Sequence, residues 1–263
     1  MYTHTIYIFL LILLIYPGRD TNLIIDPETD DPVVTLLYEA KNNFERGEED
    51  KALEIYLRVL EQEPGNYEAL WNTSFIYTRK ARSQSIYSSQ EAIYRIAREF
   101  ARVCLQIHPD KPRSHYVYAV SAAGLADNMS NTSERIQLIR DMKEYSYSAV
   151  KMDPDYAPGW HLKGVWHSKL ANVSRTERLA ARLLHGRLPD GASNEKAEEY
   201  LKRAISMDPD VILFKLDLAQ HYQETGQSKK ALPILETILE MQPVSQIDYR
   251  DMIEAKERYD ELM

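Results

Sequence analysis

The chain has 263 residues, a formal net charge of −8 and ordinary shares of hydrophobic (44%) and charged (27%) residues, which is typical of a soluble globular protein. This acidic balance argues against nonspecific nucleic-acid binding, because that binding needs a positive surface to displace counterions from phosphates. The single cysteine, Cys104, excludes an intrachain disulfide. Because Cys104 lies in an apolar helical stretch, we expect a buried thiol.

An apolar run, IYIFLLILLIY, occupies residues 6–16. As a helix it would span only about 16 Å, roughly half of a bilayer core, so residues 1–16 predict a hydrophobic export signal rather than a spanning helix. No Lys or Arg precedes the run and no small-x-small cleavage site follows it, which leaves an uncleaved membrane anchor or a misassigned start codon as alternatives. Residues 17–32, with three prolines and four aspartates, predict a flexible linker. The expected location is exported, in the periplasm or at the cell envelope, with membrane anchoring as the alternative.

The rest of the chain, residues 33–263, is built from a repeated pattern. Its clearest unit, residues 33–66, predicts two amphipathic helices with a turn at Gly47 and small residues, Ala40 and Ala52, where the helices approach. A closing proline follows the second helix in each unit, at Pro64, Pro109, Pro154, Pro209 and Pro243. The residues five before them are Val59, Cys104, Ala149, Ala204 and Ile238, and the residues twelve before are Ala52, Ala97, Met142, Ala197 and Ala231.

These alignments are typical of tetratricopeptide repeats, so we expect an all-α, right-handed superhelical array of helical hairpins. The prolines are spaced by 45, 45, 55 and 34 residues, which predicts lengthened middle repeats. The predicted repeats are about 33–66, 67–111, 112–156, 157–210 and 211–244. Residues 246–262 predict a C-terminal capping helix with Tyr249, Ile253 and Leu262 facing inward.

The second half of the chain resembles the regulator of microtubule dynamics family. Three stretches carry the resemblance: SHYVYAV at 114–120, HLKGVW at 161–166, and RLAARLLHGRLPDGASNEKAEEYLKRAISMDPD at 178–210. The resemblance implies a membrane-tethered or soluble helical repeat domain that binds other proteins and has no catalytic motif. In animal members it implies association with microtubules or organelle contacts, whereas the export-like start of this chain favours a homologue of the bacterial type.

No motif in the sequence indicates chemistry. The seven histidines give no metal-ligand spacing, and there is no HExxH, no cysteine pair, no Gly-rich phosphate loop and no G-x-S-x-G elbow. We therefore expect no enzyme, no cofactor and no metal.

Two surfaces are candidates for partner binding. The first is the concave groove lined by the first helix of each pair, where aromatic and polar side chains suit a docked polypeptide. Its candidates are Leu37, Lys41, Phe44, Trp71, Phe75, Arg113, Tyr116, His161, Val165, Leu216 and Gln220.

The second surface is an insertion at residues 170–193, whose basic candidates are Arg175, Arg178, Arg182 and Arg187. The first three share a helix face, with Leu179, Leu183 and Leu184 expected on the opposing face. The arginines predict contact with anionic lipid or an acidic partner, or alternatively a solvated face of a packed helix.

The favoured function is a non-catalytic scaffold for protein–protein interaction that uses the concave groove. The alternative is a carrier of a small apolar ligand such as a lipid, at a membrane surface, because the uneven Tyr-rich helices could enclose a cavity. The expected partners are other proteins, with possible contact to a membrane surface and no nucleic acid.

Overall fold

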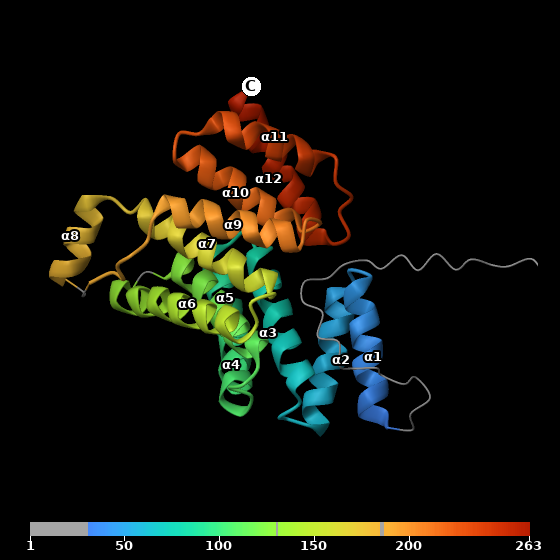
Figure 1. Ribbon diagram of the computed structural model, residues 1–263. Helices are drawn as coiled ribbons and strands as arrows, with labels where there is room; N and C mark the ends of the chain where they lie inside the picture. The colour runs from blue at the N-terminus through green and yellow to red at the C-terminus, as the bar shows by residue number, and fades with distance from the viewer. Residues whose placement is uncertain (1–30, 130, 185–186) are drawn as a thin grey trace, which may run out of the picture.

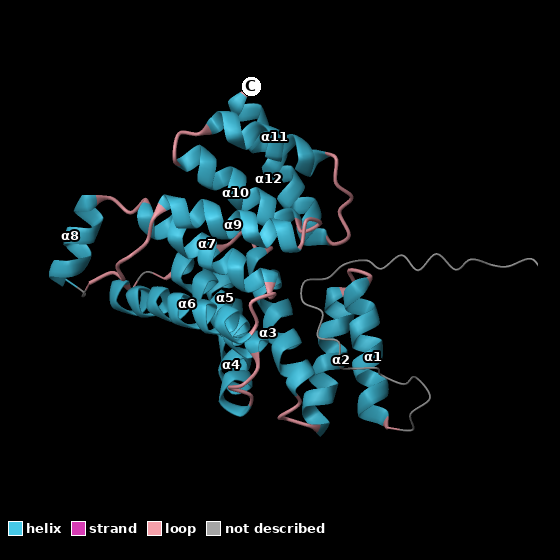
Figure 2. Cartoon of the chain, in the orientation of Figure 1, coloured by secondary structure: helices cyan, strands magenta, loops and turns pink. Residues whose placement is uncertain are grey.

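The computed structural model describes residues 31–129, 131–184 and 187–263, and that part of the chain is all helical (Figure 2). In order, the helices are α1 (Pro32–Glu45), α2 (Glu49–Gln62), α3 (Tyr67–Arg82), α4 (Tyr87–Ile107), α5 (Pro112–Asn128), α6 (Thr132–Met152), α7 (Ala157–Ala171), α8 (Arg175–Leu184), α9 (Asn194–Met207), α10 (Ile212–Glu224), α11 (Ser228–Leu239) and α12 (Gln246–Leu262). The predicted export segment, and all of the predicted linker except residues 31–32, lie outside the described residues.

Helices pack as successive hairpins that stack in chain order, from α1 and α2 at one end to α10 and α11 at the other (Figure 1). The pairs are α1 with α2, α3 with α4, α5 with α6, α7 with α9, and α10 with α11. Since α8 is skipped in this pairing, it is an insertion between the two helices of the fourth hairpin. The architecture is the expected superhelical array of tetratricopeptide type.

The unequal repeats have two structural origins. In the second and third hairpins the second helix is extended, because α4 and α6 have 21 residues each whereas α2 has 14. In the fourth hairpin the extra length is α8 and its connections. No helix in the described ranges is both long and apolar enough to cross a membrane.

The repeated positions of the sequence pattern form the contact between helices. The residues five before the closing prolines (Val59, Cys104, Ala149, Ala204 and Ile238) all have an exposed fraction of 0%. Where Pro64, Pro109, Pro154 and Pro209 follow, the second helix ends two residues earlier, because proline has no amide to donate and its ring clashes with the preceding turn. The periodic signal thus located both the core and the ends of these helices.

Cys104 is buried, as expected, and its Sγ lies 3.3 Å from Ser114 Oγ. Burial raises the pKa of this thiol to about 11. The protein in its native state therefore lacks a reactive thiolate at neutral pH among the described residues.

Gly164 on α7 lies close against Leu201 of α9. A Cβ placed there would lie 2.6 Å from Leu201 Cγ and 3.0 Å from Leu201 N, and the backbone atom has no freedom to move aside. We expect Gly164→Ala to lower the free energy of unfolding by about 1–3 kcal/mol, the usual range for overpacking a core. Gly65→Ala is the matched control, since its nearest neighbour would be a side-chain carbon at 3.7 Å. Equal urea midpoints for the two variants would contradict this packing.

Asp208 follows α9, and its side chain is buried at the end of the helix. Burial and the nearby charge of Asp210 raise its pKa from 3.8 to about 6. The folded state therefore holds this proton more tightly than the unfolded chain, and its contribution to stability is lost as the pH rises between these two values. We expect Asp208→Asn to stabilise the protein by about 1 kcal/mol near neutral pH, less than the full shift implies because solvent screens part of the charge.

Urea unfolding across the acidic range measures this effect. Asp153→Asn is the control, because the Asp153 carboxylate already accepts the Asp155 amide at 3.0 Å at the equivalent position of the third hairpin. A pH profile for Asp208→Asn that runs parallel to the wild-type profile would refute the assignment.

The capping helix α12 is present, but its orientation differs from the expected one. Tyr249 and Ile253 are 55% and 61% exposed, whereas Ile247, Asp251 and Ala255 form the buried face. Leu262 is partly buried against α10 and α11, as expected. The rotation places a carboxylate, Asp251, on the inner side of the helix, where it finds an ionic partner.

Candidate interaction groove and its closure

Aromatic rings on the first helices of the pairs form a continuous row. Ring centroids lie 6.2 Å apart for Phe44 and Phe75, 6.2 Å for Phe75 and Tyr116, and 5.3 Å for Tyr116 and Tyr156. This aromatic row links α1, α3 and α5 to the start of α7. Contacts of this kind favour edge-to-face geometry and make the row a rigid support for the side chains beside it.

Polar groups border the row at its N-terminal end. The Arg113 guanidinium lies over the Trp71 ring at 4.5 Å, and Trp71 Nε1 donates to Glu68 at 2.9 Å. Lys41 is exposed on α1, and both Trp71 and Phe75 keep part of their rings accessible. We call Lys41, Trp71, Phe75 and Arg113 the N-terminal groove, after the groove position that the repeat frame predicts for them.

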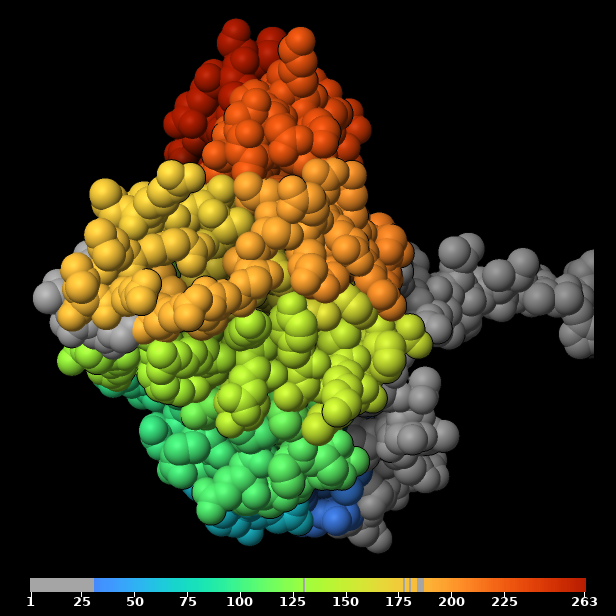
Figure 3. All heavy atoms as spheres, turned by 60° about the vertical axis from the view of Figure 1, so that its left-hand side comes forward, coloured from blue at the N-terminus to red at the C-terminus, as the bar shows by residue number. Residues whose placement is uncertain are grey.

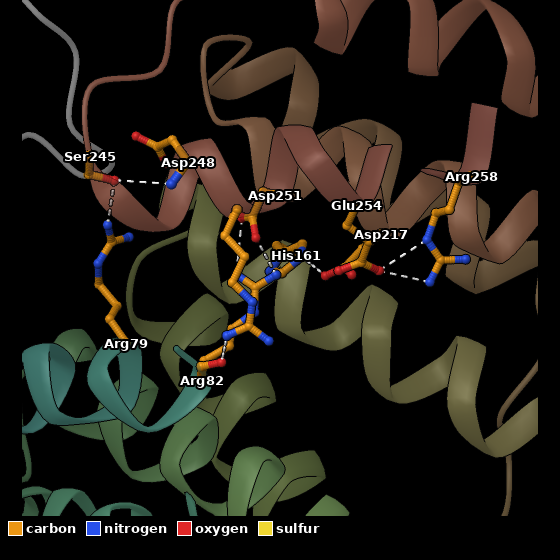
Figure 4. Close-up of polar contacts among 10 residues, drawn as sticks. Arg79, Arg82, His161, Asp217, Ser245, Asp248, Asp251, Glu254 and Arg258 are labelled. Atoms are coloured by element: carbon orange, nitrogen blue, oxygen red, sulfur yellow. Dashed lines mark hydrogen bonds and ion pairs between the residues drawn. The ribbon is translucent and has the colours of Figure 1, made fainter. Parts of the chain in front are cut away.

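At the other end of the chain, α12 and the residue before it contact α3 (Figure 4). Arg79 donates to Ser245 Oγ at 2.9 Å, and Arg82 pairs with Asp251 at 2.7 Å. Arg250 in turn donates to the Arg82 carbonyl oxygen. We call these contacts the α3–α12 seam. They join residues more than 160 positions apart, so the C-terminal helix touches the second hairpin of the array.

The seam continues through backbone contact at Gly47, the turn between α1 and α2. Gly47 has φ +76°, and a Cβ there would lie 2.7 Å from the Val244 carbonyl oxygen. Only glycine satisfies both the left-handed conformation and the close approach.

The ion pair of the seam is well protected from water. The Asp251 side chain is 2% exposed and that of Arg82 is 29% exposed. Burial raises the pKa of Asp251, although the charge of Arg82 opposes that shift. Burial alone would lower the pKa of Arg82. The charge of Asp251 opposes this effect, and the net result is a raised pKa. Each member of the pair therefore stabilises the charged form of the other.

Behind the seam, His161 of α7 is bound to Asp217 of α10 at 2.7 Å and stacks on Phe214 with centroids 4.5 Å apart. Burial raises the pKa of Asp217, but the hydrogen bond from His161 and the charges of His161 and Arg82 lower it overall. His161 is thus a buried link between two hairpins.

The structure separates the predicted groove residues into two groups. Five are buried: Leu37, Phe44, Tyr116, His161 and Leu216. These differ from the expectation of a groove surface, because they pack between neighbouring helices and so offer no surface to a partner in this closed state. The others stay partly or fully accessible: Lys41, Trp71, Phe75, Arg113, Val165 and Gln220.

The seam residues were not predicted from the sequence. Arg79 and Arg82 lie on α3, whereas Ser245 precedes α12 and Asp251 lies on it, and no local periodicity connects these residues. The one available signal was Asp251 itself, a charge four residues from Ile247 and four from Ala255 on one face of the cap.

The basic insertion forms α8, but two leucines of that helix, Leu179 and Leu183, are not packed. Leu179 is 56% and Leu183 is 73% exposed, which differs from the alternative of a packed amphipathic helix. Arg175 and Arg182 are exposed, Arg178 donates to the Leu170 carbonyl oxygen, and Arg187 pairs with Asp190 at 2.6 Å. The Leu184 side chain lies outside the described residues.

Among the hollows of the described residues, one of about 240 Å³ lies between α9, α10 and α11, and another of about 260 Å³ lies beside α8. Both are below the roughly 300–1,000 Å³ of usual small-molecule sites. Within the described ranges, no group of three or more His, Cys, Asp or Glu side chains is placed to hold a metal ion.

Comparison with known proteins gives a consistent result. The sequence model of the family described as regulator of microtubule dynamics protein 1-3 matches residues 36–263. The mouse protein named regulator of microtubule dynamics protein 1 is 25% identical over 206 residues, which cover 76% of this chain and 66% of the mouse protein. The human protein of that name is 28% identical over 113 residues, 43% of this chain and 35% of the human protein. The chain therefore matches less than two thirds of the length of each.

Among solved structures, a thermophilic tetratricopeptide repeat protein of Thermus thermophilus is similar, with a TM-score of 0.62 and 18% identity. The match covers 88% of this chain and 98% of that one. At this identity the likeness shows the fold alone, and that fold is the tetratricopeptide array.

Proposed function

Because the chain belongs to the regulator of microtubule dynamics family, we propose that it is a non-catalytic scaffold that binds a segment of another protein in its N-terminal groove. The observation that carries the proposal is the pair of half-accessible rings at Trp71 and Phe75, since the Arg113 guanidinium lies over Trp71 and Phe75 belongs to the aromatic row. Half-buried aromatic rings with cations beside them are typical of the anchors of protein interfaces.

The side chains of the N-terminal groove favour a polypeptide segment that carries an apolar side chain and a carboxylate. Rings at Trp71 and Phe75 suit an apolar side chain, and the cations of Lys41 and Arg113 suit a carboxylate. The segment that binds is expected to be short and to contact α1, α3 and α5, which carry the four residues of the N-terminal groove. The curated relatives are named as regulators of microtubule dynamics, and the proposal for this chain extends only to binding a polypeptide.

Affinity capture from native cells, with the full chain as bait, tests the proposal. We expect a protein that is retained by the wild type and lost with Trp71→Ala and with Arg113→Glu. Tyr87→Ala is the control, since Tyr87 is 75% exposed on α4, the second helix of the same hairpin as Trp71. The same capture by all four baits, or capture of nothing under several mild conditions, would refute the proposal.

A further inference from the structure

The helix α8 stands apart from the stacked hairpins, at the edge of the array (Figure 1). In the space-filling view it and the segment after it lie together on one face (Figure 3). Among its side chains with a described position, only Ala181 is buried, whereas Leu179 and Leu183 are 56% and 73% exposed. Two adjacent leucines that face water on a projecting helix need an explanation, because apolar patches on soluble proteins mark contact sites.

Helical geometry places these leucines beside the arginines. At about 100° per residue, Leu179 follows Arg175 by about 40° and Leu183 follows Leu179 by the same angle. Arg182 lies on the other side of Arg175, about 20° away. The exposed strip therefore runs from Arg182 through Arg175 to the two leucines, and differs from the opposing faces expected from the sequence.

More cations lie around the strip. Arg187 is exposed, and α6 contributes Arg140 and Lys143, whose side chains donate to the backbone oxygens of Arg187 and Asp190 at 2.9 Å each. Asp190 pairs with Arg187, but both side chains are mostly exposed to water, so this ion pair is weak. In a protein of net charge −8 this is a local concentration of positive charge.

We propose that α8 docks this protein onto a bilayer surface that contains anionic lipids. Leu179 and Leu183 enter the boundary between headgroups and acyl chains, and Arg175, Arg182 and Arg187 contact lipid phosphates. Short helices that combine exposed leucines with arginines bind membranes in this manner. A bilayer fits better than an acidic protein, because the leucines project outward, and a soft planar surface accepts a projecting pair without a matching pocket.

Sedimentation of the full chain with vesicles tests the proposal. Vesicles of phosphatidylcholine alone are compared with vesicles of phosphatidylcholine and phosphatidylserine in equal parts. We expect tighter binding to the anionic vesicles, weakened by salt. Arg175→Gln/Arg182→Gln should weaken it by about 25-fold, since each arginine near an anionic surface strengthens binding by about fivefold. Leu179→Ser/Leu183→Ser should weaken it by at least about tenfold.

The matched controls are Arg102→Gln on α4 and Ile107→Ser at its end, which also change an exposed arginine and an exposed apolar residue. They should bind as the wild type does. All variants share residues 1–16, so differences between them report on α8 alone.

A local readout adds a second test. Because Cys104 is fully buried, a polarity-sensitive dye attached to Leu183→Cys labels α8 selectively. We expect a blue shift of its emission with the anionic vesicles and none with poly-glutamate. Unchanged emission on the anionic vesicles, or vesicle binding unaffected by the leucine and arginine variants, would overturn the proposal. If poly-glutamate produced the same shift, the partner of α8 would be an acidic polypeptide and not a bilayer.

Discussion

Replacing Arg82 with methionine is expected to lower the free energy of unfolding by about 3–5 kcal/mol, because it leaves a buried carboxylate without its cation. Asp251 is 2% exposed, so water cannot take the place of the guanidinium. Methionine keeps the apolar stem of the side chain, so the loss reports mainly on charge. Urea unfolding measures it.

The pair also predicts a pattern across three variants. In Arg82→Met/Asp251→Leu neither partner of the pair is left as an unpaired buried charge, so most of the stability should return. Arg95→Met is the control: Arg95 pairs with Glu91 and Glu134 at the surface, and its loss should cost less than about 1 kcal/mol. A cost for Arg82→Met as small as that control would show that the seam contributes little to stability.

The pH dependence of Arg82→Met follows from the direction of the Asp251 shift. Burial already raises the folded-state pKa of Asp251, and loss of Arg82 removes a charge that lowers it. A carboxyl with a raised folded-state pKa stabilises the protein at low pH and loses that contribution as the pH rises through the folded value. The deficit of the variant should therefore shrink as the solution becomes more acidic.

The same ion pair explains why part of the fold was predictable and part was not. The helical hairpins follow from local signals, since small residues at fixed distances from the closing prolines must pack wherever two helices cross. The rotation of α12 depends on Arg82, which lies about 170 positions away, and this partner makes Asp251 an inner residue. Hydrophobic periodicity predicts Tyr249 and Ile253 on the inner face because a local pattern cannot account for a cation that is distant in the sequence.

The candidate site divides in the same way. Counting from the repeat frame predicts Trp71, Phe75 and Arg113 on the inner side, and the structure leaves all three partly accessible. Leu216 was counted to the same side but is 1% exposed, because α11 and α12 pack against it. A repeat position therefore belongs to the core rather than to the groove when helices from later in the chain pack against it.

Replacing Trp166 with alanine is expected to lower the free energy of unfolding by about 3–5 kcal/mol, as the loss of a large core aromatic usually does. The Trp166 side chain is 0% exposed in the middle of the array, and its Nε1 donates to the Ile139 carbonyl oxygen at 3.1 Å. Its removal would leave a cavity among α5, α6 and α7, together with a carbonyl oxygen without its donor. Thermal and urea unfolding measure the cost.

Trp71→Ala is the informative comparison, because it removes the same side chain from the N-terminal groove. Its ring is partly in water and its Nε1 donates to a glutamate of the same helix, so the cost should be about 1 kcal/mol. A folded Trp71→Ala variant is what makes its expected loss of partner binding interpretable. If instead Trp71→Ala were as costly as Trp166→Ala, Trp71 would be a structural residue of the array, and the N-terminal groove would lose the anchor on which its proposed role depends.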